Sequence, residues 1–118
     1  MSGRAAFHLM RPRKQYYVYV IELDPAVLGP RRIKEENPEY IDGMQCLYVG
    51  QTARTPEERF EQHKRGHKAN RYAKKYGRRL RPDLYDRYNP ISTREKAEAM
   101  EARLASKLRV RGYTVWYN

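Results

Sequence analysis

The residues of this sequence best suited to chemistry are Arg59 and His63, a guanidinium and an imidazole four positions apart. On a helix, side chains four positions apart stand one above the other on a single face. Just upstream, Tyr48 supplies a phenol within the short apolar segment 46–52. Where the end of such a strand meets such a helix, these three groups are suited to holding an anionic phosphate.

The helix that would carry Arg59 and His63 has an explicit start signal. Thr55 can cap its first turn, and Pro56 suits a position where a missing backbone N–H costs nothing. Glu58, three residues after the cap, completes a capping box. The sequence therefore predicts a strand, a polar turn and then a helix in a defined register.

The strongest strand signal is the segment 16–23, which is aromatic and β-branched throughout. Its alternation places Tyr17 and Tyr19 on the same face. We expect this strand to pair antiparallel with 46–52 across the proline-punctuated loop 24–45, which is long for a hairpin. Two interpretations of the loop stay open: it folds over the sheet, or it forms part of a substrate groove.

Further elements follow toward the C-terminus. Residues 84–88 are expected to form a third strand, and Ser92 with Glu95 makes a capping box for a helix over 93–110. The aromatic tail, 113–118, is expected to pack back on the sheet. At 118 residues, the chain has the length of one domain.

The apolar stripe of the helix over 93–110 brings one carboxylate close to the core. The stripe consists of Ala97, Met100, Leu104 and Leu108. Glu101 falls on its edge, where a carboxylate is costly unless it is paired or binds a cation. Two interpretations stay open on the residues alone: a salt bridge to Arg59 or another base, or a metal ligand.

Composition narrows the classes of partner. The formal net charge of +11 favours a polyanion, with nucleic acid first and an anionic membrane surface second. Apolar runs are far shorter than the roughly 20 residues of a membrane span, and no signal-peptide pattern opens the chain, so we expect no membrane partner. Cys46 is the single cysteine, which excludes an internal disulfide and fits a reducing cytoplasm.

Positive charge is concentrated in one segment, 64–81, which contains nine Lys or Arg residues and no acid. A short helix is expected over 70–76. Like charge at this density destabilises a fold through self-repulsion, which favours a surface that contacts phosphates. The residues expected to bind nucleic acid are Lys64, Arg65, Lys68, Arg71, Lys74, Lys75, Arg78 and Arg79. Residues 1–14 are also basic and are expected to form an N-terminal arm outside the domain over 15–118.

Taken in order, several motifs resemble the GIY-YIG nuclease family. They are Tyr17-Val18-Tyr19, Tyr48-Val49-Gly50, the Arg59 and His63 pair, Glu101, and the terminal Tyr117-Asn118. Each motif alone is weak, but their joint occurrence across most of the chain is fairly specific. The resemblance implies an α+β fold in which helices flank a small three-stranded antiparallel sheet, in agreement with the expected element order.

The resemblance also implies a set of catalytic residues. They are Tyr19, Tyr48, Arg59, His63, Glu101 and Asn118. Glu101 would hold one Mg²⁺ or Mn²⁺, and the activity would be metal-dependent cleavage of nucleic acid, with DNA as the expected substrate. Tyr17 occupies the place of the first motif's glycine, so Tyr17 and Tyr19 could exchange roles. The spacers from Tyr19 to Tyr48 and from Glu101 to Asn118 are longer than the family's pattern.

Each residue type has a reason to be in such a site. Tyr19 would orient or deprotonate the attacking water, which requires nearby positive charge because a free phenol titrates near 10. Arg59 would clamp phosphate oxygens, His63 would assist proton transfer, and Tyr48 would position the phosphate. Specificity is expected to rest on substrate shape or strandedness, or on a protein partner. The alternative function is a non-catalytic basic nucleic-acid-binding module on the same scaffold.

Overall fold

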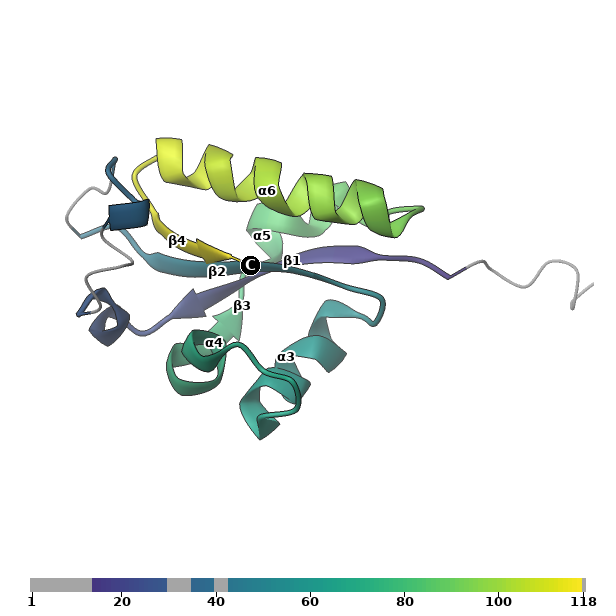
Figure 1. The fold of residues 1–118 in the computed structure, drawn as a ribbon, viewed down its shortest axis with the longest axis horizontal. Helices are drawn as coiled ribbons and strands as arrows, with labels where there is room; N and C mark the ends of the chain where they lie inside the picture. Colours follow the sequence, from purple (N-terminus) through teal and green to yellow (C-terminus); the bar gives the residue numbers. More distant parts are fainter. Residues whose placement is uncertain (1–13, 30–34, 40–42, 118) are drawn as a thin grey trace, which may run out of the picture.

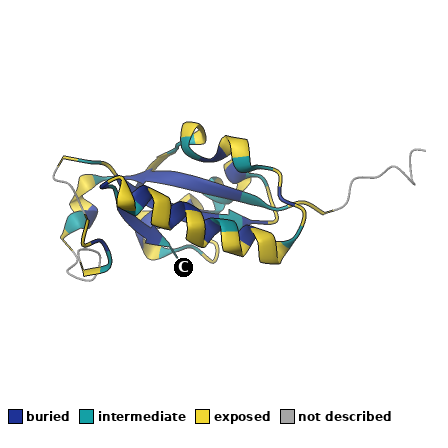
Figure 2. Cartoon of the chain, turned by 90° about the horizontal axis from the view of Figure 1, so that it is seen from above, coloured by how far each residue is buried: buried dark blue, intermediate teal, exposed yellow. Residues whose placement is uncertain are grey.

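The computed structural model describes residues 14–29, 35–39 and 43–117. A sheet lies at the centre, with the long helix α6 (Arg94–Val110) on one face and helices α3 (Pro56–Arg65) and α4 (Arg71–Tyr76) on the other (Figure 1). The sheet is buried along its length, and α6 turns an exposed side outward (Figure 2). The predicted N-terminal arm, 1–14, lies outside the described residues except for Lys14.

The sheet has four strands in the order β3-β1-β2-β4. Strands β1 (Tyr17–Leu23) and β2 (Cys46–Thr52) pair antiparallel, which confirms the predicted pairing, and Tyr19 stands opposite Gly50. Strand β3 (Gly77–Leu80) pairs antiparallel with β1, and β4 (Thr114–Tyr117) pairs parallel with β2. Helices cover both faces, so β1 and β2 are almost continuously buried.

The prediction of a three-stranded antiparallel sheet is therefore wrong. The additional strand is β4, formed by the aromatic tail that was expected only to pack back on the sheet. After α6, the turn at Gly112 has a φ of 98°, a left-handed conformation that glycine adopts without strain. This turn sends β4 back along β2, where its β-branched and aromatic side chains are well suited to a strand.

The third strand is also in a different place from the prediction. Residues 84–88 are helical, because Pro82 opens the short helix α5 (Pro82–Tyr85), which runs into the 3-10 turn η2 (Asp86–Tyr88). The third strand is instead β3. Its Arg79 lies 3.1 Å from Glu22 of β1, and its Arg78 lies 3.2 Å from Asp24, the residue after β1. An exposed edge strand tolerates such charges.

The helix starts agree well with the sequence. Thr55 caps α3 by accepting a hydrogen bond from the Glu58 backbone N–H at 3.2 Å, as predicted. Asn70 caps α4 through two backbone N–H groups. Helix α6 is capped by Thr93 rather than Ser92, because the Thr93 hydroxyl accepts from the Lys96 N–H at 3.2 Å. The predicted starts of these three helices thus lie within a residue of those observed.

The loop between β1 and β2 begins with a 3-10 turn, η1 (Pro25–Leu28), that buries Val27. Further along, the Asn37 amide oxygen accepts hydrogen bonds from the Val115 N–H at 2.7 Å and from the Arg109 guanidinium at 3.0 Å. The described part of the loop therefore covers the outer edge of β4. No helix among residues 14–29, 35–39 and 43–117 is long and apolar enough to span a bilayer.

Candidate active site

A pocket of about 350 Å³ opens beside the end of β2. Strand β4 covers only Cys46–Val49 of β2, so the last residues of β2 extend beyond it. Around this edge, which no neighbouring strand covers, α3 approaches from one face of the sheet and α6 from the other (Figure 1). The residues that line the pocket are Tyr19, Tyr48, Gln51, Arg59, Glu98, Glu101, Ala102 and Tyr117.

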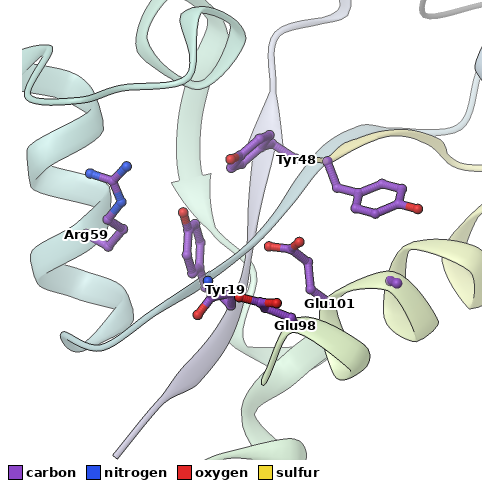
Figure 3. A pocket seen from close by; sticks show the side chains of 8 residues that line it. Tyr19, Tyr48, Arg59, Glu98 and Glu101 are labelled. Atoms are coloured by element: carbon purple, nitrogen blue, oxygen red, sulfur yellow. The ribbon is translucent and has the colours of Figure 1, made fainter. Parts of the chain in front are cut away.

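Tyr19 lies at the centre of this group, between Arg59 on one side and Glu101 on the other (Figure 3). Its side chain is 1% exposed. Gly50 makes room for it: a Cβ at residue 50 would overlap the Tyr19 ring and hydroxyl. The glycine of the Tyr-Val-Gly triplet is therefore required by close packing against the opposite strand.

His63 lies directly behind Tyr19. It is fully buried, and its Nε2 is 2.8 Å from the Tyr19 hydroxyl, while its Nδ1 accepts a hydrogen bond from the Asn70 N–H at 3.2 Å. Burial, aided by the charge of Arg59, lowers the pKa of His63 to about 4, so the ring is neutral at pH 7. Because Nδ1 is an acceptor, the ring proton is on Nε2 and is donated to the Tyr19 oxygen.

This hydrogen bond has a consequence for Tyr19. With its oxygen accepting from His63, the phenol's own proton is free to point into the pocket. Tyr48 packs against both residues, with ring centroids 6.2 Å from Tyr19 and 5.5 Å from His63. Packing among the three rings restrains the Tyr19 ring and so fixes the direction of its hydroxyl.

Arg59 forms the α3 side of the pocket and is anchored by several acceptors. Its guanidinium donates to the Gln62 side chain at 3.2 Å, to the His67 carbonyl at 3.2 Å and to the Lys68 carbonyl at 2.9 Å. These bonds join α3 to the loop before α4. The side chain is thus held at the pocket while the loop that begins the basic segment is held next to it.

The Tyr19 pKa reflects these opposing neighbours. Burial raises the pKa of Tyr19 well above its ordinary value, and Tyr48 and Glu101 act in the same direction. The positive charge of Arg59 and a hydrogen bond from it lower the pKa. In the protein alone, the neutral phenol therefore predominates at pH 7.

Glu101 enters the pocket from α6 (Figure 3). It is 8% exposed, and the backbone N–H of Gln51 donates to its carboxylate. Burial, with a smaller effect from nearby Glu98, raises the pKa of Glu101 to about 7. Of the two interpretations left by the sequence, a salt bridge to Arg59 is absent among the ion pairs of the described residues. A buried carboxylate that has no cationic partner among the described residues and faces this pocket fits a cation.

The comparisons with known proteins agree with this geometry. The model of the GIY-YIG catalytic domain matches residues 15–114, most of the chain. The chain belongs to the GIY-YIG family of nucleases. Comparisons with curated proteins and with solved structures give no significant match.

Within this GIY-YIG domain, four of the six predicted catalytic residues line one pocket: Tyr19, Tyr48, Arg59 and Glu101. His63 lies behind the pocket wall, and Asn118 lies outside the described residues.

The other predicted residues of interest are placed elsewhere. Tyr17, which could have exchanged roles with Tyr19, lines a different hollow together with Thr55 and Asn89. None of the described residues of the loop 24–45 lines the pocket.

Sequence reasoning missed Ala102 and three polar pocket residues, Gln51, Glu98 and Tyr117. Gln51 directly follows the Tyr-Val-Gly triplet, so the strand end was the one signal that pointed to it. Glu98 is three residues before Glu101, a spacing that puts both carboxylates on neighbouring positions of α6. Tyr117 could not be placed without knowing that the tail forms β4.

The side chains of the pocket limit how a metal would be coordinated. Among the described residues, no group of three or more His, Cys, Asp or Glu side chains could hold a metal ion. Glu101 would therefore be the main protein ligand, with water completing the shell. This arrangement suits Mg²⁺, which usually keeps several waters and binds through one or two carboxylates.

Substitution of Gly50 tests the packing of the GIY-YIG site. Gly50→Ala should displace the Tyr19 ring, destabilise the protein by about 1–3 kcal/mol as overpacked core positions do, and lower cleavage more than Gly43→Ala does. Gly43 is the control for a glycine change because a Cβ there meets nothing within 4 Å, although its φ of 86° strains an alanine. Urea unfolding compares the free energies of unfolding of the two variants, and a cleavage assay compares their rates. An unchanged rate in Gly50→Ala would contradict the role of this contact.

The two buried titratable groups should give opposite pH dependences of stability. The pKa of His63 falls from 6.5 to about 4 on folding, so its stabilisation is complete above about pH 6.5 and is lost as pH falls toward 4. The pKa of Glu101 rises from 4.5 to about 7, so its contribution improves as pH falls from 7 toward 4.5. Each effect amounts to at most about 3 kcal/mol.

The measurement is the free energy of unfolding in urea at pH 7 and pH 5. Relative to the unsubstituted protein, His63→Gln should gain stability on acidification and Glu101→Gln should lose it. Parallel pH profiles for both variants and the parent would contradict the burial of these two groups.

Proposed function

We propose that this protein is a divalent-metal-dependent endonuclease that hydrolyses phosphodiester bonds in DNA. The observation that carries the proposal is the convergence of Tyr19, Tyr48, Arg59 and Glu101, which come from four different elements, on one pocket. Membership of a nuclease family supports the reaction class. The net charge of +11 supports a polyanionic substrate.

Glu101 is the residue proposed to hold the metal, Mg²⁺ or Mn²⁺. A bound divalent ion supplies positive charge to phosphate oxygens and lowers the pKa of bound water. The Gln51 N–H orients the carboxylate from the strand side. Metal and proton compete for Glu101. Burial, which raises the pKa of Glu101, destabilises its charged form, and a bound cation would stabilise that form.

Tyr19 is proposed to orient the water that attacks phosphorus. His63 donates to the phenol oxygen and so fixes the direction of the hydroxyl, which makes His63 a positioning residue rather than a group that contacts substrate. If Tyr19 also accepts a proton, Arg59 favours the phenolate and burial opposes it. The attack forms one P–O bond, breaks another, and leaves an oxygen that must be protonated.

Arg59 and Tyr48 are proposed to hold the phosphate. The planar guanidinium suits the non-bridging oxygens, on which charge increases in the transition state. Because Arg59 is anchored by the His67 and Lys68 carbonyls, it needs little reorganisation when substrate binds. Tyr48 contributes to the pocket wall beside Tyr19.

The basic segment contributes a surface next to this pocket. Of the eight residues expected to bind nucleic acid, three are engaged within the protein: Lys64 donates to the Lys74 and Gly77 carbonyls, and Arg78 and Arg79 pair with Asp24 and Glu22. The other five have no ion pair with a described residue. We call these five the α3–α4 surface: Arg65, Lys68, Arg71, Lys74 and Lys75.

Salt dependence tests this surface. The double variant Arg65→Gln, Lys75→Gln should weaken DNA binding and flatten the plot of log Kd against log salt concentration by about 0.9 for each phosphate contact removed. Arg78→Gln is the control, and it should change the slope less because Asp24 lies 3.2 Å from that guanidinium. Fluorescence anisotropy with a labelled duplex gives both slopes. Equal slopes for the double variant and the parent would place the DNA elsewhere.

The proposed function is tested by cleavage of single-stranded, duplex and branched DNA and of RNA, each in Mn²⁺ and in Mg²⁺. Products from at least one DNA substrate, dependent on the metal, are expected. Tight binding without products on every substrate would favour the alternative, a non-catalytic module that binds nucleic acid on the same scaffold.

A further inference from the structure

A second charged surface lies along α6, away from the active site. Two hollows of about 390 and 450 Å³ follow the helix and share Arg103 between them. The first continues to Lys96, and the second continues to Lys107 and Arg111. We call this surface the α6 groove. From Lys96 to Arg111 it extends about 22 Å at 1.5 Å per residue.

The groove combines positive charge with an apolar floor. Ile91 and Met100 line the first hollow, and Val110 lines the second. Val110 is 66% exposed and is the one large hydrophobic side chain that is exposed among the described residues. No acidic and no aromatic side chain among the described residues lines either hollow.

The cations of the groove are largely uncompensated. Lys107 donates to the Tyr88 hydroxyl at 3.2 Å. Lys96, Arg103 and Arg111 make no ion pair with any residue that the structure describes. Two of the three acids of α6 are directed elsewhere: Glu98 pairs with Arg94 at 3.3 Å, and Glu101 enters the pocket.

The groove is turned away from the catalytic pocket. At about 100° per residue, Lys96 and Arg103 lie about 140° and about 160° around α6 from Glu101. A nucleic acid strand seated in the pocket and on the α3–α4 surface would therefore lie on the other side of this helix. The apolar floor and the absence of stacking rings among the described lining residues also do not suit a phosphate backbone or bases.

We propose that the α6 groove binds an acidic amphipathic helix of a partner protein. Acidic side chains would face Lys96, Arg103 and Arg111, and an apolar stripe would cover Met100 and Val110, which is the helix-in-groove mode of recognition. A second copy of this chain does not fit, because a two-fold contact between grooves would place the cations of one copy against the cations of the other. The groove accommodates a helix of about 15 residues at 1.5 Å per residue.

The test uses a designed probe, because the partner is defined here only by its chemistry. A fluorescein-labelled peptide of about 16 residues carries Leu at positions three and four apart and Glu or Ala elsewhere. A scrambled peptide of the same composition is the control. Anisotropy should show that the amphipathic peptide binds at least tenfold more tightly than the scrambled peptide.

Variants locate the binding site. The double variant Lys96→Glu, Arg103→Glu should bind the peptide at least tenfold more weakly than the parent. Val110→Ser, at an exposed position, should bind it at least threefold more weakly. The variant Arg65→Gln, Lys75→Gln on the α3–α4 surface should bind the peptide like the parent protein. Cleavage by the groove variants at saturating DNA should remain at the parent level.

Three results would overturn the proposal. They are no binding of the amphipathic peptide, equal binding of the scrambled peptide, or equal loss in the α3–α4 variant. Displacement of the peptide by a duplex oligonucleotide, with a matching loss of DNA binding in Lys96→Glu, Arg103→Glu, would assign the groove to nucleic acid instead. The proposal does not depend on catalysis, so peptide binding can succeed whether or not cleavage is observed.

Discussion

Glu101→Gln is expected to reduce metal-dependent cleavage at least about 1,000-fold, which corresponds to about 4 kcal/mol of transition-state stabilisation. Glutamine has nearly the same shape and keeps an oxygen that can accept from the Gln51 N–H, while the charge that would hold the cation is lost. Binding of DNA in EDTA should be unchanged or slightly tighter, because the substitution removes one negative charge from the pocket. Cleavage kinetics and anisotropy give the two quantities.

Glu98→Gln is the matched control for this change. Glu98 also lines the pocket, but its side chain is 57% exposed and already pairs with Arg94. The cleavage rate of Glu98→Gln should fall much less than that of Glu101→Gln. Equal activity of Glu101→Gln and the parent protein would remove Glu101 from the metal site.

Arg59→Ala should lower kcat by about 100- to 1,000-fold, the cost of removing one preorganised donor from a developing negative charge. The effect should be larger on kcat than on Kd for DNA, because the guanidinium acts on charge that increases in the transition state. Arg59→Lys should recover part of the rate, since it keeps the charge without the planar fork. Single-turnover cleavage separates these effects.

Arg59 also has a structural role, and a control must separate it from the proposed catalytic role. Its bonds to the His67 and Lys68 carbonyls hold the loop before α4. Arg54→Ala removes an exposed arginine from the same region, where it pairs with Glu58 at 3.5 Å, and should leave kcat unchanged. A kcat for Arg59→Ala equal to that of Arg54→Ala would contradict a catalytic role for Arg59.

The elements that position the site were readable in the sequence because their signals are local. The Thr55 cap fixes where α3 begins, and therefore which face carries Arg59 and His63. The aromatic and β-branched residues of β1 and β2 identify both strands, and the observed register sets Tyr19 opposite Gly50. The position of Glu101 at the edge of an apolar stripe likewise indicated a carboxylate near the core.

The features that could not be predicted from the sequence depend on contacts between distant segments. The strand β3 contains Gly77 and two arginines, so its strand character comes from pairing with β1 rather than from its own side chains. The role of β4 depends on the turn at Gly112 and on an open edge of β2. The buried state of His63 follows from the packing of α4 against α3, which no periodicity of α3 alone predicts.

The central claim is that one pocket binds a divalent cation and a phosphodiester together and cleaves the latter. The most direct measurement follows a labelled DNA substrate with the parent protein in Mg²⁺, then after excess EDTA, then after Mg²⁺ is restored. We expect product to accumulate, stop and resume, with DNA still bound throughout. Products that continue to form in EDTA, or bound DNA that remains intact in both Mg²⁺ and Mn²⁺, would contradict the account.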